Sequence, residues 1–286
     1  MKLIKPSVEI IKQEEYDLNH IFKFIELAGR TCYKSEDKIT EDSAKPFIDR
    51  MIKSKHFAML EHGTVYLTIP NKNISRSLLI YKYETNPYSK VVCTDDNIYI
   101  TTNYRVIIEN NWIEHLEYIT SPTEFHEKRI TVRFIANIHF YKDLTRHRKM
   151  SYAIESTRFC NYTKDRFGGE LTFIQPCWLD EEYVPGEYNR SERFVILTEM
   201  LENVESTYNF MINSGWQAQQ AANILPQATK AEIIVTGFAK DWKYIFDLRA
   251  IGTTGKPHPQ MQELMIPLMK EFINRKYISY DSKCMV

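Results

Sequence analysis

Helix and strand signals follow one another irregularly along this chain, and that irregularity limits the fold more than any other feature of the sequence. Apolar residues at helical spacing run through the first 55 residues, and a second short helix is expected over residues 43–52. A β-rich segment at residues 64–69 ends at Pro70, which cannot donate to a sheet ladder. A doubly wound sheet needs regular alternation. We therefore predict an α+β fold, with a central mixed or antiparallel sheet and flanking helices.

The second half of the chain shows mainly helix signals. Apolar residues from Phe194 to Met211 recur at steps of three and four, which predicts a long amphipathic helix that ends at Gly215 and packs on the core. The other elements expected are a strand or helix start over residues 131–138, helices over 217–225, 240–250 and 259–274, and a short strand over 231–237.

Residues 71–129 differ in composition from the rest of the chain. They are rich in Asn, Tyr, Lys and Thr, and the run Asp95-Asp96-Asn97 is a turn signal between alternating segments. We interpret them as a β-rich insertion with a hairpin and one short helix over residues 112–119, within a single domain of residues 1–286. The simplest interpretation of the insertion is a surface embellishment.

The charge and cysteine content exclude several classes of protein. Lys+Arg and Asp+Glu both number 37, so no global field gathers nucleic-acid polymers, and a bound anion needs a local site. No apolar run approaches the roughly 20 residues that cross a bilayer. Five cysteines without a C-x-x-C pair indicate reduced thiols and no metal site. We therefore expect a soluble, cytoplasmic chain that does not bind membranes.

The usual nucleotide and hydrolase motifs are missing. The chain has nine glycines and no G-x-G-x-x-G fingerprint, and the run from Gly252 to Lys256 is too short for a Walker loop. It also lacks H-E-x-x-H and G-x-S-x-G. What remains is a dense group of cations and hydroxyls in the run RHRKMSYAIESTR at residues 146–158. Guanidinium forks match phosphate geometry and an imidazole ring can stack on a heterocycle, so this run predicts a phosphorylated, planar ligand.

The spacing within this run is that of a known signature. R-H-R at residues 146–148, then seven residues, then Ser156, resembles the motif of the flavin-dependent thymidylate synthases. Ser151 and Arg158 fall on the extended family pattern. Two further blocks are similar to the family in the same order. They are HFAMLEH, with His56 and Glu61-His62, and a closing block with Leu225-Pro226, Leu248-Arg249-Ala250, His258 and Gln260.

The resemblance implies a central α/β domain and a homotetramer whose active sites are shared between subunits. It implies reductive methylation of dUMP to dTMP with methylenetetrahydrofolate, the folate co-substrate, and with FAD and NADPH. Reduced flavin is the hydride donor in that reaction. No protein cysteine attacks the uracil in this family, which agrees with the lack of a cysteine beside a base in this sequence.

The matched positions imply roles for individual residues. Hydride addition to uracil places negative charge on the ring oxygens, so a fixed cation at that edge stabilises the transition state, and Arg249 is the candidate catalytic residue. The candidates for binding dUMP are Arg146, Glu155, Ser156, Thr157, Arg158 and Arg249. The candidates for binding FAD are His56, Glu61, Arg146, His147, Arg148, Lys240 and Tyr244. No metal ligand is expected.

Several positions depart from the family pattern. Ala153 and Ile154 stand where Asn and Glu are usual, Asp143 replaces a glutamine, and Ala222 replaces an arginine expected to contact phosphate. The segment from Arg249 to His258 is longer than usual and is either a mobile flap or a surface loop.

These departures leave two alternatives to thymidylate synthesis open. One is a hydroxymethylase of the same scaffold acting on dUMP, because the lost Asn and Glu can change how the one-carbon unit is handled. The other is a nucleotide- or flavin-binding protein with impaired catalysis. The natural reductant and the role of residues 71–129 stay open at this point.

Overall fold

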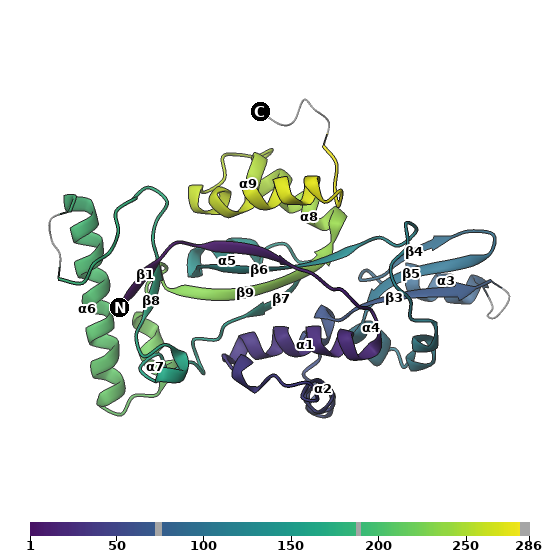
Figure 1. Ribbon diagram of the computed structural model, residues 1–286, viewed down its shortest axis with the longest axis horizontal. Coiled ribbons are helices and arrows are strands. Elements are labelled where there is room, and N and C mark those ends of the chain that lie inside the picture. The colour runs from purple at the N-terminus through teal and green to yellow at the C-terminus, as the bar shows by residue number, and fades with distance from the viewer. Residues whose placement is uncertain (72–75, 187–189, 281–286) are drawn as a thin grey trace.

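An antiparallel sheet forms the centre of the molecule, and the computed structural model describes residues 1–71, 76–186 and 190–280 (Figure 1). Its strands are, in spatial order, β2 (Ser7–Ile11), β6 (Arg129–Asn137), β9 (Lys230–Phe238) and β7 (Ser151–Ile154). β9 lies between β6 and β7 and is buried almost throughout. The predicted α+β class with a central antiparallel sheet is confirmed.

Helices cover both faces of this sheet, with α1 and α2 on one side and α5, α8 and α9 on the other (Figure 1). The bounds of these helices are α1 Leu18–Tyr33, α2 Ala44–Lys53, α5 Ile138–Leu144, α8 Ala239–Phe246 and α9 Pro259–Asn274. Neighbouring residues of β9 divide between the two cores, because successive side chains of a strand point to opposite faces. Ile234 packs with the α1 side and Ile233 with the α8–α9 side.

The prediction of helix throughout the first 55 residues was wrong at the N-terminus. β1 (Lys2–Ile4) and β2 come before α1, and β2 pairs with β6 in the register Val8↔Phe134. The sequence of β2, SVEII, alternates polar and apolar residues at its start, which is the period of a half-buried strand. The longer run of helically spaced apolar residues that follows in α1 outweighed this short strand pattern in the prediction.

A second sheet lies beside the central one and contains part of the predicted insertion. Its strands run in the order β3 (Thr64–Pro70), β5 (Asn97–Asn103) and β4 (Lys90–Cys93). The predicted hairpin is present as β4 and β5. The short helix predicted over residues 112–119 is present as a 3-10 helix at Ile113–Tyr118, but the prediction missed α3 (Arg76–Glu84) and α4 (Tyr104–Glu109) in the same segment. Because β3 pairs with β5 along its length, the sheet begins before residue 71.

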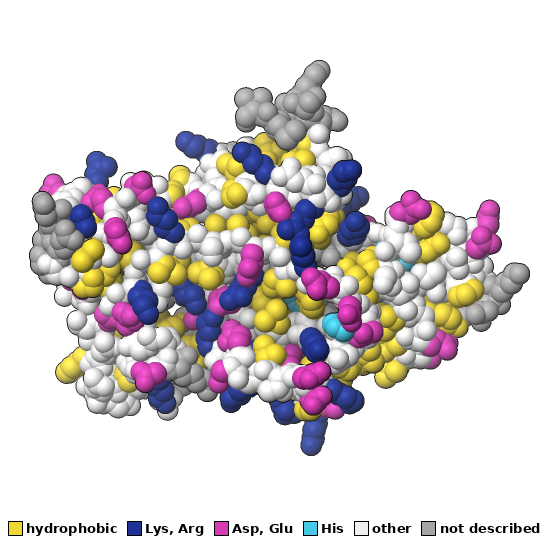
Figure 2. Space-filling view, in the orientation of Figure 1, with side chains coloured by type: hydrophobic (Ala, Val, Ile, Leu, Met, Phe, Trp, Pro, Cys, Tyr) yellow, Lys and Arg dark blue, Asp and Glu magenta, His cyan; other side chains and the backbone are white. Residues whose placement is uncertain are grey.

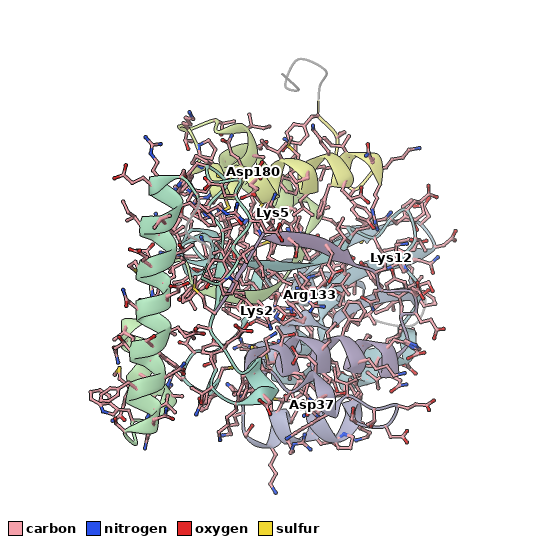
Figure 3. The ribbon with its side chains drawn as sticks, turned by 60° about the vertical axis from the view of Figure 1, so that its left-hand side comes forward. Lys2, Lys5, Lys12, Asp37, Arg133 and Asp180 are labelled. Atoms are coloured by element: carbon pink, nitrogen blue, oxygen red, sulfur yellow. The ribbon has the colours of Figure 1, made fainter. Side chains whose placement is uncertain are left out.

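The long helix α6 (Glu192–Asn213) stands at one end of the molecule, beside the parallel pair β1 and β8 (Thr172–Ile174) (Figures 1 and 3). Gly215 follows with φ +91, in the left-handed region that ends helices. A short helix, α7 (Ala218–Ala221), comes next. Nearby, Lys5 Nζ donates to Asp180 Oδ1 at 3.0 Å, and Figure 3 labels both residues. These contacts attach the end of the chain's first strand to the loop before α6.

α6 packs on the core as predicted, but it also carries apolar side chains on its outward side. Phe194 and Leu201 are buried, yet Ile196, Met200 and Phe210 are 61%, 43% and 71% exposed. At 100° per residue, these three exposed side chains lie on one side of the helix. The helix therefore has two apolar sides, one of which faces outward in the single chain.

Charged side chains of both signs are interspersed over the face of the molecule seen in Figure 2. This agrees with a neutral chain that has no broad field of one sign. Within the described residues, none of the helices is both long enough and apolar enough to cross a membrane.

Candidate active site

The R-H-R turn and the segment around Arg249 meet at one cavity of about 610 Å³. β7 is antiparallel to β9, with Ser151 opposite Thr236, so the turn before β7 lies next to the helix after β9. The lining consists of residues from these two segments, namely Arg146, His147, Arg148, Lys149, Met150, Lys240, Asp241, Tyr244, Leu248 and Arg249. Six of the sequence-predicted site residues therefore surround the same space.

Arg249 is held in place by His147 of the R-H-R turn and by Asp143, which comes just before that turn. It lies in a π-helical turn at Asp247–Ile251 that continues α8, a geometry that is frequent at functional sites. Its Nε donates to His147 Nε2 at 3.2 Å, and its Nη2 donates to the Asp143 carbonyl oxygen at 3.2 Å. The Asp143 carboxylate lies 3.7 Å from Nη1. These contacts fix the direction of the guanidinium at the cavity wall.

Asp143 has a part in the site that sequence reasoning did not assign. Its carboxylate also lies 3.7 Å from Arg146 Nε, so it is shared between two of the predicted arginines. The position was noted only as a departure from a family glutamine. Its place one turn before Arg146 on a helical segment was the signal that could have suggested an ion pair.

His147 is a neutral imidazole in this arrangement. Burial, together with the neighbouring Arg249 cation, lowers its pKa to about 4. Because Arg249 Nε donates to His147 Nε2, the single ring proton belongs on Nδ1. The ring meets Tyr244 edge to face, with centroids 6.1 Å apart. The cavity therefore has a flat, uncharged ring beside its fixed cation.

We expect the imidazole of His147 to stay neutral at pH 7 and to gain its proton only as the pH falls to about 4. In Arg249→Ala, the pKa of His147 should rise part of the way toward its ordinary value of 6.5, because burial remains while the neighbouring charge is removed. NMR titration of histidine-labelled protein measures both values. Protonation of His147 near pH 6.5 in the wild-type protein would contradict the geometry.

The remaining cations of the cavity are exposed. Arg146, Arg148 and Lys240 project toward solvent, and the Tyr244 ring is 60% exposed. One carboxylate, Asp241, lies in the lining, and burial raises its pKa. An aromatic ring among exposed cations matches a ligand that combines a planar ring system with phosphate groups.

The second part of the motif lies at the other end of β7. Ser156 N donates to the Cys32 carbonyl oxygen at the end of α1, at 2.9 Å. Arg158 is exposed, with its guanidinium 5.5 Å from the Phe159 ring centroid, and Thr157 lies between these two residues. β7 has four residues, so roughly 13 Å of strand separates this loop from the R-H-R turn. A single chain therefore does not bring Arg158 and Arg249 to one cavity.

Glu155 is buried, and its carboxylate belongs to an internal charge network. It accepts from Lys230 Nζ at 2.7 Å, from Tyr162 Oη at 3.2 Å and from Glu232 N at 3.1 Å. Lys34 bridges the Glu155 and Glu232 carboxylates, and Arg133 lies 2.5 Å from Glu232. The cations lower the pKa of Glu232 against the opposing effect of burial. The Glu155 side chain thus anchors the loop before Ser156 and does not project from it.

His56 and Glu61 lie apart from the 610 Å³ cavity. His56 is exposed before a 3-10 helix at Phe57–His62, and its N donates to the Met51 carbonyl oxygen at 2.8 Å. Glu61 accepts from Arg105 Nη1 at 2.6 Å and lines a separate cavity of about 170 Å³. In the single chain these two flavin candidates therefore do not join the others.

Two motif departures have a structural explanation. Ala153 is fully buried and packs with the α1 core, while Ile154 packs against the core on the other face of the sheet. Both positions lie within β7, so apolar side chains there stabilise the strand. Cys160 is also buried, which raises the pKa of its thiol to about 12. It therefore remains a thiol at neutral pH and is unsuited to attack a substrate.

Comparison with known proteins bears on this site directly. The family described as thymidylate synthase complementing protein matches residues 88–275, which contain the whole R-H-R motif and Arg249. The chain belongs to this family. The match begins inside residues 71–129, so part of the segment that we interpreted as an insertion lies within the family region.

Curated relatives of this chain are named flavin-dependent thymidylate synthase, which confirms the resemblance. The protein of Haloarcula marismortui is 22% identical over 152 residues, 49% of this chain and 62% of its own length. That of Corynebacterium aurimucosum is 22% identical, covering 90% of this chain and 78% of the relative. That of Corynebacterium efficiens is 30% identical, covering 79% and 66%. The chain thus spans slightly less than two thirds of the length of the Haloarcula marismortui and Corynebacterium efficiens relatives.

Solved structures similar to this family member include a UMP/dUMP methylase, PolB from Streptomyces cacaoi, bound with 5-Br dUMP. It is 15% identical, with a TM-score of 0.45, and the likeness covers 96% of this chain and 93% of that one.

Proposed function

We propose that this chain methylates dUMP reductively to dTMP, with methylenetetrahydrofolate as the carbon donor, FAD as the hydride carrier and NADPH as the reductant. Membership of the thymidylate synthase complementing protein family supports the proposal. The observation that supports it most is the convergence of the R-H-R turn and Arg249 on one cavity. Four free cysteines among the described residues are compatible with a reducing cytoplasm, where we place the reaction.

The residues of the cavity fit a flavin dinucleotide. Arg146, Arg148 and Lys240 are exposed cations suited to a pyrophosphate, and His147 and Tyr244 offer ring surfaces to an isoalloxazine. Bound there, FAD would supply the hydride that reduces the one-carbon unit on the pyrimidine. Asp241 is the one carboxylate among the described residues of the lining, and burial raises its pKa.

Arg249 is the proposed catalytic residue because its charge is fixed before substrate arrives. Three contacts to Asp143 and His147 orient its guanidinium, so little reorganisation is needed when negative charge develops on the uracil oxygens. The neutral His147 does not compete with Arg249 for that negative charge. We propose that Ser156, Thr157 and Arg158 bind the dUMP phosphate and sugar, with Arg146 near the nucleotide.

An active site shared between subunits would bring together the residues at the two ends of β7, which a single chain keeps apart. We propose a homotetramer in which the Ser156–Arg158 loop of one subunit completes the cavity formed by Arg249 in its neighbour, and in which His56 and Glu61 contact the flavin across an interface. The outward apolar side of α6, formed by Ile196, Met200 and Phe210, supports burial against another copy.

Mixing two inactive variants tests the sharing of sites. Arg158→Ala and Arg249→Ala should each be inactive alone, and co-refolded mixtures should regain part of the wild-type turnover, since some sites then receive Arg158 and Arg249 from different subunits. Turnover of dUMP is measured before and after mixing, with a mixture of Arg158→Ala and an Arg158→Ala/Arg249→Ala double variant as the control. Mixtures as inactive as that control would contradict shared sites.

The identity of the product tests the proposed reaction itself. Incubation with dUMP, FAD, methylenetetrahydrofolate and NADPH should yield dTMP, whose mass exceeds that of dUMP by the replacement of one hydrogen with a methyl group. A hydroxymethyl product, identified by mass, would establish the hydroxymethylase instead. A protein that takes up neither FAD nor dUMP would overturn both reactions.

A further inference from the structure

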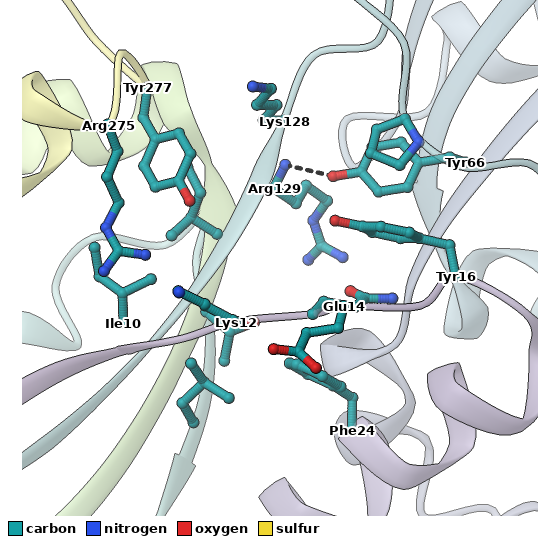
Figure 4. A pocket seen from close by; sticks show the side chains of 15 residues that line it. Ile10, Lys12, Glu14, Tyr16, Phe24, Tyr66, Lys128, Arg129, Arg275 and Tyr277 are labelled. Atoms are coloured by element: carbon teal, nitrogen blue, oxygen red, sulfur yellow. Dashed lines mark hydrogen bonds between the residues drawn. The ribbon is translucent and has the colours of Figure 1, made fainter.

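A second cavity lies where β2 separates from β6, at the start of α1 (Figure 4). The last pair of the β2–β6 ladder is Ile11↔Thr131, after which the chain turns away toward Tyr16 while β6 extends back to Arg129. The gap has a volume of about 300 Å³, the lower end of the range of small-molecule sites. It shares no residue with the 610 Å³ cavity.

The lining of this cavity is strongly cationic for a chain without net charge. Lys12, Lys128, Arg129 and Arg275 line it, against the single carboxylate of Glu14. Arg275 Nε donates to Glu271 behind the cavity at 2.6 Å. Four cations set against these two carboxylates give the cavity a local excess of positive charge, which the Glu61 and Asp241 carboxylates partly offset at Arg129. A phosphate monoester, with a charge of about −1.5 to −2 at pH 7, matches this excess.

Arg129 is the innermost of these cations. Burial lowers the pKa of its guanidinium to about 10. Its side chain donates to three neutral acceptors, which are the Glu61 carbonyl oxygen at 3.1 Å, Thr64 Oγ1 at 3.3 Å and Ser151 Oγ at 3.5 Å. Among the described residues, none of the carboxylates lies within ion-pairing distance of it. A desolvated guanidinium whose hydrogen-bond acceptors are all neutral favours binding of an anion.

Aromatic rings form the rest of the wall. Tyr16 and Tyr66 meet edge to face with centroids 5.3 Å apart, and Lys128 Nζ lies 5.7 Å from the ring centroid of Tyr277. Figure 4 shows Tyr16 and Tyr66 on one side of the cavity and Tyr277 on the other, with the Arg129 side chain between them. The Tyr66 hydroxyl oxygen accepts from Arg129 N at 3.1 Å, which leaves its proton available to donate. Ring faces together with donors suit a planar ring that bears an anionic group.

A buried polar group in the same lining also lacks a partner. Gln13 lies between Lys12 and Glu14, and its Nε2 is buried without a hydrogen-bond partner among the described residues. An unsatisfied buried donor costs about 1–3 kcal/mol, so a ligand that accepts from it relieves this cost.

We propose that this cavity binds a nucleoside monophosphate, with the phosphate on Arg129, Lys12 and Lys128 and the ring against the tyrosines. The site is distinct from the proposed active site. It shares no lining residue with the 610 Å³ cavity. It also lies at the start of α1, whereas the loop of Ser156 contacts the end of α1, about 24 Å along the helix. The proposal does not depend on the proposed reaction.

Calorimetric titration with uridine 5′-monophosphate tests the site in the Arg158→Ala background, which weakens binding at the proposed substrate loop. We expect one saturable site per chain. Lys12→Ala/Lys128→Ala should weaken it on the order of tenfold or more, and Tyr277→Ala about tenfold. Lys53→Ala/Lys270→Ala removes two exposed lysines away from the cavity and should leave the affinity unchanged. Uridine and inorganic phosphate, titrated separately, should each bind at least about tenfold more weakly.

Three results would overturn the proposal. One is the absence of UMP binding in the Arg158→Ala protein. Another is equal affinity in the cavity and control double variants. The third is inorganic phosphate binding as tightly as UMP, because the ring then contributes nothing. Thermal melting of each variant verifies that it is folded. Lys12 and Lys128 are exposed at the rim of the cavity, so their loss should not unfold the chain.

Discussion

Arg249→Ala should lower kcat/KM for dUMP methylation on the order of 100- to 1000-fold while leaving the fold intact. The guanidinium is oriented by His147 and by the carbonyl and carboxylate of Asp143, so its charge is in position before the transition state forms. Removal of an interaction that forms only in the transition state lowers kcat and kcat/KM together. Steady-state kinetics with the dTMP product quantified by mass gives the ratio.

Two further variants define the origin of that loss. Arg249→Lys should recover a minor part of the activity, since an ammonium is a point charge and cannot keep both contacts to Asp143 and His147. Arg50→Ala removes an exposed arginine of α2 and serves as the control, with activity expected at the wild-type level. An Arg249→Ala enzyme within threefold of the wild type would exclude the assigned role.

Glu155→Ala should reduce the free energy of unfolding by about 3–5 kcal/mol, the cost of breaking a buried ion pair on one side. The substitution leaves the Lys230 ammonium and the Glu232 N–H without their acceptor in the interior. Urea unfolding followed by tryptophan fluorescence measures the change. Asp49→Ala, which breaks the exposed Lys45–Asp49 pair, should cost less than about 1 kcal/mol.

The same network makes stability depend on pH in a defined direction. The folded-state pKa of Glu232 lies below its ordinary value of 4.5, because Lys34, Arg133 and Lys230 favour the charged carboxylate. The contribution of Glu232 to the free energy of unfolding is therefore complete above pH 4.5 and is lost as the pH falls through the lower folded pKa.

For the Glu155→Ala experiment, a variant as stable as Asp49→Ala would show that the buried charge network is dispensable for folding.

The elements with strong periodicity could be predicted from the sequence. The helical repeat from Phe194 to Met211 corresponds to α6, and the apolar run at residues 231–237 corresponds to β9, because these periods follow from the geometry of one backbone segment. Short elements were missed for the same reason. β2 has five residues, too few for its alternation to outweigh the helical pattern that follows.

The sequence predicted which residues belong to the candidate site, but it did not predict how their side chains are arranged. Motif spacing identified Arg146, His147 and Arg249 as members, and the pairing of β7 with β9 places them at one cavity. Motif position did not show that Glu155 points inward, nor that Asp143 holds Arg249. A pattern in one dimension states which residues are present, and it does not state which way each side chain of a strand or loop faces.

The sequence by itself determined the family, the α+β class and the identity of the R-H-R and Arg249 segments, because these depend on residue types at short, regular spacings. Tertiary structure alone decided that Arg249 contacts His147, that Arg158 lies at the far end of β7, and that cations meet tyrosines beside β2. The physical reason is that contacts between residues far apart in the chain depend on strand register and on which buried charges find partners, and neither is encoded in a local pattern.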